Sequence, residues 1–211
     1  MKKTYNKYIA FTLLAASLGL SSCDSFLDEL PDNRMELKNE QDITDLLVSA
    51  YPARPPAYLL ERYSDNNDQF DVTGWNDANQ FDEEAYNWKD ITDISTDEAP
   101  QSLWEDFYLR VATANQALQA IEKQGNPSSL DAQRGEALLC RAYNEFMLAN
   151  VFCNAYSPTT ADKELGVPYP TEPEEHVGTQ YQRGTLKQLY DQINSDIDTA
   201  LPLVRDDQYS Q

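Results

Sequence analysis

The sequence predicts an all-α protein, built from helical hairpins that are joined by long irregular loops. Apolar residues recur at a spacing of three and four positions in four separate segments, which is typical of amphipathic helices. Proline and glycine clusters separate these segments, and no stretch alternates apolar and polar residues convincingly enough for a strand. Because 41% of the residues are hydrophobic and 11% are aromatic, the chain can form a core and is not compositionally disordered.

The first 22 residues have the layout of a secretory signal. Residues 1–7 contain three lysines and no acid, residues 8–20 are free of charge and largely apolar, and small residues precede Cys23. The apolar run is shorter than the roughly 20 residues that a spanning helix needs. We therefore expect a signal peptide over residues 1–22, an acidic tether over residues 23–38 and a helical domain over residues 39–211.

The first two predicted helices cover about residues 40–51 and 103–123. Pro52 ends the first helix. Ser102 and Glu105 have the spacing of a capping box at the start of the second helix, and the sequence Gly-Asn-Pro from Gly125 ends it. Trp104 lies beside the apolar stripe of this helix, and we expect it to belong to the core.

The third and fourth predicted helices cover about residues 130–154 and 186–201. The third is apolar on more than one face, which indicates burial between neighbours. The fourth begins with a second capping-box pattern, Thr185 and Gln188. The second and third helices form a hairpin close to the length of one tetratricopeptide-type repeat, and such a unit needs neighbours to cover both of its faces. Residues 166–170 are predicted to form an extended loop.

Two polar residues and two cysteines fall within the predicted helices. Asn115 and Arg141 are flanked by apolar residues, so we expect buried polar ties between helices. Cys140 and Cys153 lie on one helix, where their separation of about 20 Å exceeds the ~7 Å that a disulfide can bridge. They are expected to be buried thiols.

Charge and motif content argue against several classes of function. With 16 basic and 36 acidic residues the formal net charge is −20, which disfavours binding to nucleic acid. The single histidine, His176, lies in a proline-rich loop, and the sequence has no Cys/His cluster, nucleophile elbow or glycine-rich phosphate loop. The acidic residues between Asp65 and Asp71 lack the pattern of an EF-hand and are interpreted as a turn. We expect no catalytic residues, metal or cofactor.

Residues 135–146 carry a resemblance to a known family. The run Gly-Glu-Ala-Leu-Leu-Cys-Arg-Ala-Tyr-Asn-Glu-Phe resembles the Gly-Glu-Ala-x-x-x-Arg-Ala-x-x-x-Phe motif of SusD/RagB-type nutrient-binding lipoproteins. Further matches follow the order of the family: Cys23 before Phe26-Leu27-Asp28, residues 63–66, Trp104 to Asn115, residues 166–170, and Arg183-Gly184-Thr185 before the fourth helix.

The resemblance implies a fold, a location and a role. It implies a tetratricopeptide-like SusD fold, of which this much shorter chain is expected to hold an incomplete N-terminal part. Leu20-Ser21-Ser22-Cys23 resembles a bacterial lipobox, so Cys23 is expected to carry lipid and to anchor the chain in the outer membrane, facing the cell exterior. The implied role is the capture of oligosaccharides for import by a SusC-like, TonB-dependent transporter.

Aromatic and amide side chains between residues 72 and 89 are the candidate glycan contacts. Trp75, Asn76, Tyr86 and Trp88 lie in a stretch with no clear helical period, and flat rings with amides suit sugar binding. The alternative is that Tyr86 and Trp88 pin this loop to the core. For the whole chain the alternatives are a helical-repeat surface adaptor that binds a protein, a non-functional truncated fragment and a glycoside-acting enzyme.

Overall fold

Helices form the regular secondary structure of the residues described by the computed structural model, which are residues 37, 39–66, 80–174, 176 and 178–205. The described part from Leu37 onward makes one compact unit. Within it no β-strand forms, and the only strand-like pairing is an isolated antiparallel bridge between Leu165 and Thr185. The all-α prediction is confirmed.

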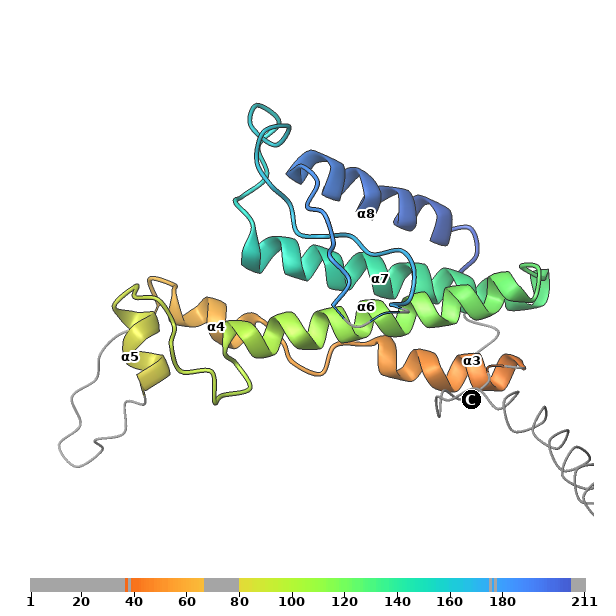
Figure 1. The fold of residues 1–211 in the computed structure, drawn as a ribbon, viewed down its shortest axis with the longest axis horizontal. Helices are drawn as coiled ribbons and strands as arrows, with labels where there is room; N and C mark the ends of the chain where they lie inside the picture. The colour runs from red at the N-terminus through yellow and green to blue at the C-terminus, as the bar shows by residue number, and fades with distance from the viewer. Residues whose placement is uncertain (1–36, 38, 67–79, 175, 177, 206–211) are drawn as a thin grey trace, which may run out of the picture. The chain divides into compact units, whose positions relative to one another are not determined.

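All four predicted helices are present, with boundaries close to those expected (Figure 1). They are α3 (Glu40–Leu47, continued by a 3-10 turn, η1, Val48–Ala50), α6 (Pro100–Lys123), α7 (Asp131–Phe152, preceded by the 3-10 turn η2, Ser128–Leu130) and α8 (Leu186–Ala200).

Two short helices, α4 (Ala57–Arg62) and α5 (Gln80–Tyr86), were not predicted. The stretch of residues 72–89 was expected to have no helical structure, and α5 corrects that expectation for residues 80–86. Leu59 is the buried residue of α4, and Phe81 and Ala85 are those of α5. One or two buried positions in fewer than two full turns do not produce a recognisable helical period.

The two predicted capping boxes had different outcomes. The N–H of Gln188 donates to Thr185 Oγ1 at 3.2 Å, and the N–H of Thr185 donates to Gln188 Oε1 at 2.8 Å, which confirms the box at α8. At α6 the prediction was wrong. The helix begins three residues earlier than predicted, at Pro100, whose missing N–H is not needed at a first helical position. Ser102 lies inside the helix and donates to the carbonyl of Thr96 at 3.0 Å.

The hairpin of α6 and α7 is the centre of the fold (Figure 1). Gly125 and Asn126 adopt the left-handed conformation that reverses the chain between the two helices, as predicted. On the other side α7 packs along α8, and α3 packs on α6 and α7. A Cβ on Gly135 would lie 3.0 Å from Leu203 Cβ and 3.2 Å from the carbonyl oxygen of Ala200, so glycine permits close approach of α7 to the turn after α8.

Two hydrophobic clusters lie along this hairpin. The first joins the N-terminal part of α6 and the C-terminal part of α7 to α8, α4 and α5; the second joins the opposite ends of α6 and α7 to α3. Both thiols are free, as expected; Cys140 is buried as predicted, whereas Cys153 is only half-buried. The largest fully buried apolar side chains are Phe81, Phe107, Ile43, Leu47, Leu103, Ile121, Leu148, Leu186 and Val111.

A buried arginine links four parts of the fold. Arg141 on α7 is 6% exposed, and its Nε and Nη2 donate to the two carboxylate oxygens of Asp196 on α8 at 2.6 and 2.8 Å. Its Nη1 donates to Asn115 Oδ1 on α6 at 2.9 Å and approaches the carbonyl of Thr171 at 3.4 Å. The hydroxyl of Tyr169 also donates to Asp196, at 2.6 Å. The predicted role of Asn115 and Arg141 as polar ties is confirmed.

Glu145, one turn further along α7, is buried without hydrogen bonds. Its side chain is fully buried, and neither carboxylate oxygen has a hydrogen-bond partner among the described residues. Burial raises the pKa of Glu145 to about 9, against a smaller opposing effect of Arg141. The side chain is therefore protonated at neutral pH.

Replacing Asp196 by alanine should strongly destabilise the fold, because it leaves the charge of Arg141 buried without its carboxylate. We expect a loss of about 3–5 kcal/mol in the free energy of unfolding, measured by urea denaturation. Asp191→Ala is the matched control. It breaks the exposed pair of Lys187 and Asp191, whose side chains are 53% and 59% exposed, and should cost less than about 0.5 kcal/mol. Equal losses of unfolding free energy in the two variants would contradict the role of Asp196 as the buried partner of Arg141.

Replacing Glu145 by glutamine should flatten the pH dependence of stability. Above its ordinary pKa this carboxyl is ionised in the unfolded chain but keeps its proton in the folded chain up to about pH 9. The folded state thus binds more protons, and its stability falls as pH rises from about 5 to 9. Urea denaturation at pH 5 to 8 should show a slope difference on the order of 1 kcal/mol per pH unit between wild type and Glu145→Gln. Identical slopes would show that Glu145 is ionised in the fold.

Candidate functional site

The most exposed aromatic side chain of the described residues is Trp88, two positions after the end of α5. It is 73% exposed, and its ring centroid lies 5.0 Å from that of Tyr63 with the planes tilted by 58°. Its φ of 53° is a conformation that bulky side chains rarely adopt. This is the left-handed position that ends α5: the N–H of Trp88 donates to the carbonyl of Ala85 at 3.0 Å, and the N–H of Lys89 donates to that of Glu84 at 2.8 Å. The two rings lie together at the surface, and the Tyr63–Trp88 pair is the candidate binding surface.

Hydrogen bonds around Glu84 fix the chain on both sides of Trp88. Glu84 accepts from the N–H of Thr92 at 2.7 Å and from the side-chain amide of Gln80 at 2.8 Å. Hydrogen bonds from the Thr92 side chain and then from Gln80 lower the pKa of Glu84 to about 2. The carboxylate remains charged, and it holds residues 92–93 against α5, so that residues 87–91 form a closed loop that carries Trp88 outward.

An arginine joins α4 to α5 beside this pair. Arg62 Nε donates to Asp82 at 2.5 Å, and its guanidinium lies 4.1 Å from the centroid of the Tyr58 ring. Tyr58 is 50% exposed. The arrangement gives the α4–α5 region a second exposed ring, with a positive charge held against it.

Two of the four residues predicted to contact glycan, Tyr86 and Trp88, are described by the structure, and both side chains are exposed. Tyr86 is 39% exposed and Trp88 is 73% exposed, so the alternative in which Trp88 pins its loop to the core does not hold. Trp75, Asn76 and the predicted lipid site Cys23 lie outside the described residues. Residues 63–66 were noted only as a match to the family, and Tyr63 was not selected as a glycan contact, because its contact with Trp88 depends on the packing of α4 against α5, which was not predicted.

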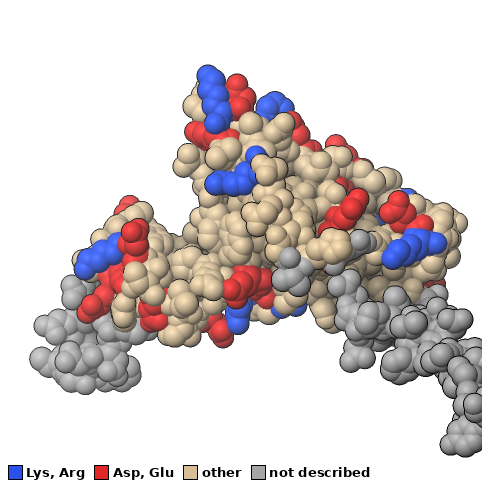
Figure 2. Space-filling model, viewed as in Figure 1, with Lys and Arg blue, Asp and Glu red and all other residues tan. Residues whose placement is uncertain are grey.

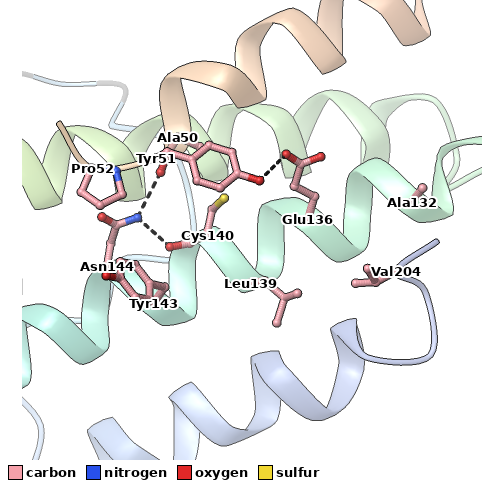
Figure 3. Close-up of a pocket in the computed structure, with 10 residues that line it drawn as sticks. All are labelled: Ala50, Tyr51, Pro52, Ala132, Glu136, Leu139, Cys140, Tyr143, Asn144 and Val204. Atoms are coloured by element: carbon pink, nitrogen blue, oxygen red, sulfur yellow. Dashed lines mark hydrogen bonds between the residues drawn. The ribbon is translucent and has the colours of Figure 1, made fainter. Parts of the chain in front are cut away.

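Three cavities also lie on the described part of the chain, and Tyr86 and Trp88 line none of them. The first, of about 540 Å³, lies between η1, α7 and Val204 (Figure 3). In this cavity the hydroxyl of Tyr51 donates to Glu136 at 2.7 Å, and the amide of Asn144 donates to the carbonyl of Ala50 at 3.1 Å. Its remaining walls are largely apolar.

The second cavity is an open groove of about 480 Å³ between α7 and α8. It shares Leu139 and Tyr143 with the first cavity, so the two form one continuous apolar surface along α7. Tyr143 is 48% exposed and Phe146 is 38% exposed. This surface, the α7 apolar face, has the character of an interaction surface.

The third cavity is a cleft of about 280 Å³ between α6 and the segment that connects α7 to α8. Trp104, predicted to be core, is half-buried, contacts the first hydrophobic cluster and also lines this cleft. Figure 2 shows that the visible face is mostly uncharged over its centre, with charged side chains gathered nearer its margins.

The described residues offer neither a metal site nor a membrane-spanning helix. Among the residues that the structure describes, no group of three or more His, Cys, Asp or Glu side chains is placed to hold a metal ion. In that part of the chain no helix has the length and apolar character needed to cross a bilayer.

These features define the class of protein: a helical-repeat scaffold that presents an exposed aromatic pair. The chain belongs to the SusD-like family, described as "starch-binding associating with outer membrane", whose model matches residues 25–211.

A solved structure shows the same fold. It is a SusD superfamily protein from Bacteroides thetaiotaomicron VPI-5482, similar to this chain with a TM-score of 0.58 and 21% sequence identity. The match covers 77% of this chain and 37% of that protein, so this chain corresponds to well under half of its length. A search of curated proteins found no match.

Replacing Trp88 by asparagine should leave stability nearly unchanged. Asparagine tolerates a positive φ, so relief of backbone strain offsets the lost contact with Tyr63. We expect the free energy of unfolding to stay within about 0.5 kcal/mol of wild type. A loss above about 2 kcal/mol in urea denaturation would show that Trp88 is a packing residue.

Proposed function

We propose that this chain captures oligosaccharides at the cell surface, and that the Tyr63–Trp88 pair contacts the sugar. The observation that carries the proposal is the exposure of Trp88 at 73% on a loop held by hydrogen bonds. A fixed ring loses little entropy when a pyranose stacks its apolar face on it. Tyr86 and Asn87 precede it in sequence. The side-chain nitrogen of Asn87 donates to the carbonyl of Glu83 at 2.8 Å, so its side-chain oxygen and the Tyr86 hydroxyl are the groups that can bond the hydroxyls around that face.

Trp75 and Asn76 extend the proposed surface. Both precede α5 by only a few residues, so the chain can bring them to the sugar that Trp88 binds. Two rings along an extended glycan would each add a weak contact, which suits a protein that must release its ligand for import.

We further propose that Cys23 carries the lipid that holds the chain in the outer membrane, with residues 1–22 removed and residues 39–211 forming the helical domain. The family description, with its association with the outer membrane, supports this location. Labelling of cells with a radioactive fatty acid should mark the wild-type chain but not Cys23→Ala. Label retained in the variant would overturn the anchor.

The proposed partner is a SusC-like, TonB-dependent transporter, which would take up the captured glycan. The net charge of −20 keeps the body of the protein away from anionic headgroups, so contact with the membrane would run through the lipid and the transporter. Copurification of such a transporter with the detergent-solubilised lipoprotein tests this, and its absence under mild cross-linking would count against it.

Substitution of the tryptophans should weaken glycan binding without loss of structure. In titration calorimetry against a panel of polysaccharides, Trp88→Asn and Trp75→Ala should each lower the affinity by about fivefold to tenfold, since a stacked ring contributes about 1 kcal/mol. Tyr156→Ala is the matched control. Tyr156 is 41% exposed, and its ring centroid lies 4.8 Å from that of Tyr190 on α8; it contacts neither ring of the Tyr63–Trp88 pair, so its removal should not change the affinity.

A second function, a surface adaptor that binds a protein, is favoured by the α7 apolar face. The calorimetric panel separates the two roles. If the chain is an adaptor, no glycan of the panel should produce heat. A photoreactive residue placed at position 143 should then cross-link to a protein partner, and the cross-link should be lost in Phe146→Asp. Binding of a glycan that Trp88→Asn weakens and Phe146→Asp does not would decide for capture.

A further inference from the structure

The cleft between α6 and the α7–α8 connection has a rigid wall. The hydroxyl of Tyr108 donates to the carbonyl of Pro168 at 2.9 Å, and the side-chain amide of Asn115 donates to the carbonyl of Pro170 at 2.9 Å. The ring centroid of Trp104 lies 4.8 Å from that of Tyr108, with the planes tilted by 55°, and 5.0 Å from that of Phe152 in an edge-to-face contact. These contacts come from two helices and the connection, so the cleft is preformed.

The lining of the cleft combines rings with carboxylates. Trp104, Tyr108 and Tyr181 supply aromatic rings, and Glu172 and Glu174 supply two exposed carboxylates. Burial, followed by the neighbouring charge of Glu174, raises the pKa of the Tyr181 hydroxyl. The other lining residues are Ala112, Asn115, Pro168 and Pro170, and neither lysine nor arginine is among them.

The polar groups of the cleft select against an anionic ligand. Asn115 uses its amide hydrogens on the carbonyls of Pro170 and Glu172, and its oxygen accepts from Arg141. The hydroxyl hydrogen of Tyr108 is already used in its hydrogen bond to the carbonyl of Pro168. What remains for a ligand is mainly ring faces and carboxylates, and both attract positive charge.

We infer that this cleft binds a small organic cation, with its ammonium group against the rings of Trp104, Tyr108 and Tyr181 and paired with Glu172 and Glu174. Its volume of about 280 Å³ lies just below the usual range for larger ligands, so the ligand is small. This site is separate from the Tyr63–Trp88 pair, and it does not depend on glycan capture.

Choline and 3,3-dimethylbutan-1-ol test the inference, because they share a shape and differ in charge. In titration calorimetry of the whole chain we expect choline to bind, and the neutral alcohol to bind at least tenfold more weakly. Tyr181→Leu should weaken choline binding by about fivefold, and the double variant Glu172→Gln with Glu174→Gln by at least that factor. Ionic strength should lower the affinity of wild type more than that of the double variant.

Matched controls keep the result specific. Glu122→Gln removes an exposed charge from the far end of α6, and Tyr143→Leu removes an exposed ring from α7; neither residue lines the cleft. Both should bind choline as wild type does. The inference is overturned if choline produces no heat at tens of millimolar, if the alcohol binds equally well, or if the controls weaken binding as much as the cleft variants.

Discussion

The bond between Arg141 and Asp196 is the constraint on which the rest of the helical scaffold depends. It is bidentate, with both side chains almost fully buried, at 7% and 5% exposed. The third guanidinium nitrogen, Nη1, donates to Asn115 Oδ1 and approaches the carbonyl of Thr171. A buried charge must find all of these partners at once, so the register of α6, α7, α8 and the connection is fixed together.

This constraint explains why the binding features lie around the hairpin and not within it. The interior of α7 holds the arginine and the protonated Glu145, both buried, and the arginine is bonded to α6, α8 and Thr171. The connection that Tyr169 and Asn115 hold in place forms one wall of the cleft, and the Tyr63–Trp88 pair is carried by short helices outside the hairpin. A rigid scaffold thus presents two separate aromatic surfaces.

The long helices and their polar ties could be predicted from the sequence, and the site could be predicted only in part. Apolar residues recur at helical spacing over several turns in α6, α7 and α8, and the capping box of Thr185 and Gln188 depends only on residues close in sequence, so both can be read from the sequence. Ser102 misled the prediction because Pro100 starts the helix equally well. The pairing of Tyr63 with Trp88 and the cleft beside Trp104 arise from packing between distant segments, which leaves no local pattern to read.

The central claim is that sugar binds to the Tyr63–Trp88 pair on a rigid scaffold. The most direct test is a ¹H–¹⁵N spectrum recorded while an oligosaccharide is titrated in, because the chain has only three tryptophans and so gives three indole signals. If sugar is captured on the exposed pair, the indole signal of Trp88 should shift. The indole signal of Trp104 and the Nε–H signal of Arg141 should stay in place, because the scaffold is rigid. A shift of Trp104 with Trp88 unchanged would contradict the account.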